Sequence, residues 1–244
     1  MENISMIILL VLCFLMPVMA LEGFERDIVE TSQGDLEITF IGHGTLMFRF
    51  GNKVIHVDPW SRLADYSKLP KADLILLTHH HGDHLDPAAL QQIRTDRTVV
   101  VLTAICAQNV TGDVVMENGD LRELLSIEIL AVPAYNLVHK RESGEFFHPK
   151  GEGNGYVLTF GDTRVYIAGD TENTPEMKAL ENLDVAFLPV NLPYTMSPEM
   201  VLDAVKAFKP KVLYPYHYGD TDVAGLVEML KECPDTEVRV RKME

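Results

Sequence analysis

The six residues from His79 to His84 contain four of the nine histidines of the 244-residue chain, in the order His-His-His-Gly-Asp-His. They directly follow residues 73–77 (Asp-Leu-Ile-Leu-Leu), an apolar run typical of a strand buried on both faces. In an extended segment alternate side chains share a side, so His79 and His81 face one way, and Asp83 and His84 follow the turn. A solvated turn explains neither the clustering nor its position after a core strand. The segment therefore predicts a site for zinc, or for iron or manganese, beside the end of that strand.

Gly-containing turns divide much of the chain into paired strands. Such turns join residues 36–41 to 46–50 and residues 156–160 to 164–168, which predicts two hairpins. The other strands are predicted at residues 54–57, 73–77, 99–102, 127–132, 185–190, 212–216 and 237–240.

Helices are predicted between these strands. Residues 87–93 and 198–208 each begin with proline and follow a residue that can cap a helix, Asp86 and Ser197 respectively. A third helix is predicted at residues 223–233. Two mixed sheets packed face to face with helices outside would bury every apolar face. The expected fold class is therefore α/β (α+β), a four-layer αββα sandwich.

Composition limits the partners of this chain. It has 47% hydrophobic residues, which excludes intrinsic disorder, and 21 Lys and Arg against 36 Asp and Glu, a net charge of −15. Such a surface repels nucleic-acid phosphates and anionic lipid. We therefore expect a small-molecule substrate, no nucleic acid and no membrane for the mature domain, and leave homo-oligomers open.

The N-terminus resembles a targeting segment. Residues 6–20 form an apolar run of fifteen residues, shorter than the roughly 20 that a spanning helix needs. The run ends in Val-Met-Ala, a small-x-small pattern, so residues 1–20 are predicted as a signal peptide and residues 21–244 as a single exported domain, periplasmic or secreted. Because Glu2 is the only charge before the run, an uncleaved membrane anchor and a misplaced start codon in a cytoplasmic protein stay open.

The histidine cluster resembles the signature of a known family. The pattern His79-x-His81-x-Asp83-His84 is similar to that of the metallo-β-lactamase superfamily, whose fold is an αββα sandwich with metals at one edge between the sheets. Three further residues match the superfamily pattern in order, each at the end of a predicted strand: Asp58, Asp170 and His217. The chain most resembles a branch of hydrolases related to the ascorbate-phosphate lactonases, and the supporting segments are residues 42–45, 155–156, 164–171, 175–177 and 187–190.

The resemblance implies a role for each matching residue. Asp170 would bridge two divalent ions, and Asp83 would bind the second ion and orient the nucleophile. Asp58 would orient a ligand ring. The implied histidine ligands are His79 and His81 on the first ion, and His84 and His217 on the second.

The chain departs from the family at one position. Where most members place a histidine ligand, it has Asn136, whose neutral amide oxygen is a weak ligand for zinc. Two histidines follow within residues 136–155, a long segment without periodicity. His148, which runs into the next strand, is the predicted replacement ligand or a substrate contact. His139 has charged neighbours and is expected to be solvated.

The expected function is that of a binuclear metal-dependent hydrolase, with two divalent ions, most often zinc, supplying a metal-activated hydroxide. Asp83 and Asp170 are the predicted catalytic residues, and a small ester, lactone or phosphodiester is the predicted substrate. His43 is left open between a substrate contact and a turn-stabilising hydrogen bond, and Tyr194 between a proton donor and packing. The alternatives are a β-lactamase, although lactamases of this fold lack the bridging aspartate seen as Asp170, and a non-catalytic metal-binding or sensing module, which Asn136 supports.

Overall fold

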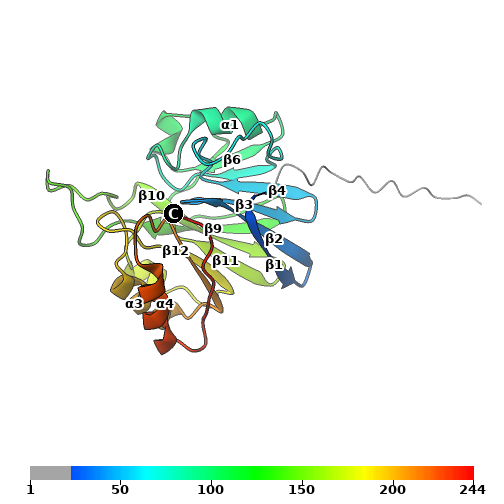
Figure 1. Ribbon diagram of the computed structural model, residues 1–244. Helices are drawn as coiled ribbons and strands as arrows, with labels where there is room; N and C mark the ends of the chain where they lie inside the picture. The colour runs from blue at the N-terminus through cyan, green and yellow to red at the C-terminus, as the bar shows by residue number, and fades with distance from the viewer. Residues whose placement is uncertain (1–22) are drawn as a thin grey trace, which may run out of the picture.

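The computed structural model describes residues 23–244, so the predicted signal peptide lies outside the described residues. Two mixed sheets of seven strands each pack face to face (Figure 1). The first consists, in spatial order, of β1 (Glu25–Thr31), β2 (Gly34–Gly42), β3 (Thr45–Phe50), β4 (Lys53–Val57), β5 (Leu74–Leu76), β6 (Val99–Leu102) and β7 (Val114–Val115). The second consists of β14 (Glu237–Val238), β13 (Val212–Tyr216), β12 (Val185–Pro189), β11 (Thr163–Ile167), β10 (Gly153–Phe160), β9 (Ile127–Ala134) and β8 (Leu121–Leu124).

Helices cover the outer faces of the two sheets. Figure 1 shows α1 (Pro87–Ile93) over the first sheet, and α3 (Pro198–Phe208) and α4 (Val223–Met229) beside the second. A short helix, α2 (Pro175–Lys178), packs against α3. The predicted αββα sandwich is thus confirmed. No helix among residues 23–244 combines the length and the apolar character needed to cross a membrane.

The predicted caps explain where the helices begin. The Asp86 side chain accepts hydrogen bonds from the first amides of α1, and the Ser197 side chain accepts one from Met200 at the start of α3. The third predicted helix is shorter than expected: α4 ends at Met229 and continues as a single 3₁₀ turn, Leu230–Glu232.

The main core lies between the two sheets. Phe40 and Phe48 of the first sheet contact Phe187 of the second, with ring centroids 6.3 and 6.1 Å apart. A second apolar cluster lies between the first sheet and α1, and includes Ile75 and Leu90. Burial of these side chains fixes both sheets and therefore the edge at which their loops meet.

The strand directions gather the predicted site at one edge. The strands β4 and β5 are parallel neighbours, as are β11, β12 and β13. Parallel strands end at the same edge of a sheet. Asp58 follows β4, the histidine cluster follows β5, Asp170 follows β11 and His217 follows β13, so all four come to the edge between the sheets.

Candidate metal centre

Two adjacent groups of side chains offer ligand atoms that lie within 4.8 Å of one another inside each group. One group combines the first histidines of the cluster with the long loop and β11: His79, His81, His148 and Asp170. The other combines the end of the cluster with two loops far away in sequence: His43, Asp83, His84 and His217. The structure thus brings together all seven predicted ligands and adds His43 to them.

Asp170 lies between the two groups. Its Oδ2 is 3.3 Å from His148 Nε2 in the first group and 3.3 Å from His217 Nε2 in the second. Its Oδ1 is 3.4 Å from His84 Nε2. One buried carboxylate therefore faces both groups.

The donor atoms of both groups are suited to metal cations. Several buried atoms that face this space have no hydrogen-bond partner in the described residues: His84 Nε2, His148 Nε2, His217 Nε2 and Asp170 Oδ1. An unpaired buried polar atom is costly, so such a group needs a partner. Histidine nitrogens and carboxylate oxygens are the ligands that zinc, iron and manganese accept, and the residues present therefore fit the expected ions.

Asp58 orients two of the histidine rings. Its Oδ2 is 2.8 Å from His84 Nδ1, which leaves Nε2 as the atom that faces Asp170. The Thr78 hydroxyl donates to the same oxygen at 2.6 Å and is 3.0 Å from His79 Nδ1. Nothing in the sequence indicated Thr78, because its role depends on the position of Asp58 on a neighbouring strand.

Glycine and strained backbone let the loops approach one another. A side chain at position 44 would place Cβ 2.7 Å from the His84 ring, so only glycine fits there. Gly169 has φ +65° and lies against Thr78, which turns the chain towards Asp170. His43, Asp58 and His217 also have positive φ, a conformation that non-glycine residues adopt mainly where function or packing requires it.

The pKa shifts leave three of the candidate ligands without the proton that a metal would have to displace. Burial lowers the pKa of His79 well below 6.5 and that of His81 to about 4. Burial alone would raise the pKa of Asp170, but the surrounding histidines hold it well below its usual range. Burial also opposes a charge on His84, but Asp170 and Asp58 outweigh it and raise its pKa to about 9. At neutral pH His79, His81 and Asp170 are thus in the metal-binding form, and His84 keeps a proton that a metal would displace.

A pocket of about 490 Å³ opens onto the two groups. Arg141, Phe147, Asn191 and Tyr194 line it together with the histidines and carboxylates. The Arg141 guanidinium lies over the Phe147 ring at 4.9 Å, and its Nη2 is 3.5 Å from His81 Nε2. Within residues 23–244 it forms no ion pair with a carboxylate. Tyr194 packs edge-on against Phe147 at 5.1 Å and is 47% exposed at the rim. The pocket therefore offers a cation and aromatic surface to a bound molecule.

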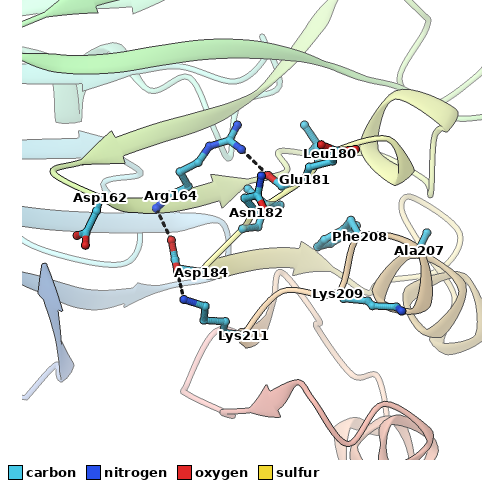
Figure 2. A pocket seen from close by; sticks show the side chains of 11 residues that line it. Asp162, Arg164, Leu180, Glu181, Asn182, Asp184, Ala207, Phe208, Lys209 and Lys211 are labelled. Atoms are coloured by element: carbon cyan, nitrogen blue, oxygen red, sulfur yellow. Dashed lines mark hydrogen bonds and ion pairs between the residues drawn. The ribbon is translucent and has the colours of Figure 1, made fainter.

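A larger cavity of about 640 Å³ lies at the opposite end of the second sheet (Figure 2). Its lining residues contact one another: Asp184 accepts from the Arg164 main-chain amide at 2.8 Å and pairs with Lys211 Nζ at 2.7 Å. It faces the amino ends of the parallel strands and contains no histidine. Ligands of open α/β sheets bind at the carboxyl ends, so the smaller pocket is the candidate site.

The long loop differs from the sequence-based expectation at one residue. His139 was expected to be solvated, but its side chain is 28% exposed and its Nδ1 is 2.7 Å from the buried Glu172 carboxylate. Glu172 and Arg141 were not predicted as site residues. A carboxylate two residues after Asp170 and a cation within the loop were the only sequence signals, and neither is distinctive without the fold.

His43 contacts both the C-terminal residue and the site. Its Nε2 is 3.2 Å from Asp83 Oδ2, its Nδ1 is 3.3 Å from the Glu244 main-chain oxygen, and its ring lies 3.7 Å from that of His217. His43 therefore restrains the Asp83 carboxylate. Because His43 also belongs to the second group, it is a further candidate ligand.

Comparisons with known proteins show the family of this chain. Residues 37–217 match the family model of the beta-lactamase superfamily domain. A metal-dependent hydrolase from Methanopyrus kandleri is 34% identical over 197 residues, which cover 75% of this chain and 84% of the relative.

Solved structures give the same result. A protein from Parabacteroides distasonis, described as a metal-dependent hydrolase, is 47% identical with a TM-score of 0.86, over 91% of this chain and 100% of that one. A metallo hydrolase from Ignicoccus hospitalis is 25% identical with a TM-score of 0.70, over 86% of this chain and 96% of that one. The chain belongs to the metallo-β-lactamase superfamily, as one of its metal-dependent hydrolases.

Proposed function

We propose that this protein is a binuclear hydrolase that holds two divalent ions, zinc in preference to manganese or iron, and cleaves a small ester, lactone or phosphodiester. The position of Asp170 between two groups of ligands carries this proposal. His79, His81 and His148 would hold one ion, and Asp83, His84 and His217 the other. Asp170 would be shared. Two bound ions would lower the pKa of a coordinated water from about 15.7 towards about 7 and stabilise negative charge that develops on the substrate.

The residues of the chain supply the rest of the reaction. In hydrolysis, the bond from the electrophilic carbon or phosphorus to the leaving group is replaced by a bond to water oxygen. Asp83 is 35% exposed, lines the pocket and is restrained by His43, so its Oδ2 is placed to accept a hydrogen bond from the attacking water and orient it. Hydrogen bonds from the buried Asp58 and Thr78 side chains keep the His84 and His79 rings from rotating during the step.

The function is tested by metal content and turnover together. We suggest an aryl phosphodiester, an aryl ester and a simple lactone as substrates, with a chromogenic β-lactam as comparison, for the zinc-loaded and the chelator-treated protein. The expected result is two metals per chain and metal-dependent hydrolysis of at least one of the first three. Full metal loading without turnover of any of them would support the non-catalytic module, and preference for the β-lactam would support the lactamase.

Arg141→Gln tests whether the pocket recognises an anionic group. A charge-assisted hydrogen bond contributes about 1.5–3 kcal/mol, so loss of the guanidinium should raise KM for a phosphodiester by roughly tenfold or more, with metal content unchanged. Steady-state kinetics measure this. Arg122→Gln is the matched control, since Arg122 lies on β8 and pairs with Asp120 away from the pocket. Equal KM values in wild type and Arg141→Gln would remove Arg141 from the substrate site.

A further inference from the structure

Glu172 is a fully buried carboxylate for which the reaction described above gives no role. It lies two residues after Asp170, and its two oxygens accept five hydrogen bonds from the beginning of the long loop. The donors are Asn136 Nδ2 at 3.0 Å, Leu137 N at 2.7 Å, Val138 N at 2.7 Å, His139 N at 2.8 Å and His139 Nδ1 at 2.7 Å. The amide of Asn136 and the main-chain N–H groups donate, so both Glu172 oxygens act as acceptors.

The Asn136 amide can have only one orientation in this network. Its Nδ2 faces the Glu172 carboxylate and, at 2.9 Å, the Tyr194 carbonyl oxygen, and both of these groups only accept hydrogen bonds. Its Oδ1 accepts from the His148 main-chain N–H at 2.8 Å, which only donates. Partners on both sides therefore fix the amide with Oδ1 towards His148.

This orientation determines the proton on His148. The ring Nδ1 is 2.8 Å from Asn136 Oδ1, which only accepts, so Nδ1 carries a hydrogen and the lone pair of the neutral ring is on Nε2. Nε2 is buried, has no hydrogen-bond partner in the described residues and lies 3.3 Å from Asp170 Oδ2. A neutral ring thus directs its Nε2 lone pair at a carboxylate oxygen, an arrangement that a proton or a metal cation between the two atoms stabilises.

We propose that Glu172 and Asn136 are positioning residues, which together fix the tautomer and the direction of the His148 ring so that Nε2 is presented to the metal. The proposal rests on the proposed function in taking His148 as a ligand. Asn136 thus directs the proposed ligand that lies twelve residues further along the chain. The chain Glu172–Asn136–His148 thus parallels Asp58–His84 on the other side of Asp170.

The first test is metal affinity of the full chain. Zinc is titrated against a chromophoric chelator in wild type, Glu172→Gln, Asn136→Ala and His148→Ala. Each variant should weaken one of the two zinc ions by roughly 10- to 100-fold or more, the range for groups that orient a ligand. Because the changes act through one ring, Glu172→Gln combined with His148→Ala should cost no more than His148→Ala alone. Glu176→Gln is the matched control: this carboxylate, on α2, bonds to Tyr135 and Lys150 and should leave both affinities unchanged.

Asn136→Ala separates positioning from simple anchoring of the loop. It breaks the link to His148 while Glu172 keeps its bonds to the loop amides, so the variant should fold even where Glu172→Gln does not. Wild-type zinc affinity in Asn136→Ala would mean that Glu172 only anchors the loop and would overturn the proposal. Full additivity in the double variant would do the same.

A second readout does not depend on metal or activity. Nitrogen-15 NMR of the metal-free protein should show His148 as the Nδ1–H tautomer in wild type and Glu176→Gln, and as a mixture in Asn136→Ala. An Nε2–H tautomer in wild type would contradict the proposal. A wild type that binds two zinc ions and hydrolyses nothing would defeat the proposed function, but the tautomer and the affinity losses would still decide the role of Glu172 and Asn136.

Discussion

Asp170→Asn is expected to lose one of two bound metal ions and at least about a hundredfold in turnover, the scale measured for key electrostatic groups in active sites. The substitution keeps the shape of the side chain but removes the charge that faces His148 in the first group and His84 and His217 in the second. The amide oxygen that remains is neutral and a weaker ligand, and the amide nitrogen donates hydrogen bonds instead of binding a metal. Elemental analysis and single-substrate kinetics on the same preparation measure both effects.

The control for this variant is Asp184→Asn, which changes a carboxylate at the opposite end of the same sheet. It should leave metal content and turnover as in wild type. Two metals and an unchanged rate in Asp170→Asn would show that the carboxylate is not shared between the ions.

Zinc is expected to stabilise the metal-free chain strongly. The two groups bring buried imidazoles and carboxylates together without hydrogen-bond partners for several of their atoms, so the folded state binds the ion and the unfolded state lacks the site. At free zinc one hundredfold above the dissociation constant, each site adds about 2.7 kcal/mol to the free energy of unfolding. Calorimetric melting with and without zinc, and a titration to equivalence at two ions per chain, measure it.

Magnesium serves as the control metal, since it prefers oxygen ligands and binds imidazole-rich sites weakly. It should shift the melting temperature far less than zinc does. A zinc titration that reaches equivalence at one ion per chain, or a melting temperature that zinc leaves unchanged, would contradict the binuclear arrangement.

Local sequence patterns predicted those helices and strands whose caps and apolar residues lie within the element itself. The helix α1 has its cap, proline and apolar face within eight residues, from Asp86 to Ile93, and β5 is apolar throughout, so both were predicted at nearly their observed bounds. The first strand, β1, was not predicted. Its side chains are exposed or half-buried and largely charged, and only its pairing with β2 makes it a strand.

The same distinction applies to the metal centre. The sequence by itself determined His79, His81, Asp83 and His84 as a group, because six residues at the end of a buried strand hold them in register. Only the tertiary structure decided the partners of that group. Packing of the two sheets brings Asp170 and His217 from the second sheet to the cluster of the first, and their spacing in the chain does not specify that distance.

The role of Asn136 also depended on the fold. In the sequence, Asn136 occupies the position where a histidine ligand was expected, and it therefore supported the interpretation as a non-catalytic metal-binding module. In the structure its amide contacts Glu172, Tyr194 and His148, three residues separated from it by 36, 58 and 12 positions. A hydrogen-bond network of this kind has no sequence periodicity, because each bond depends on where distant loops lie after the cores have packed.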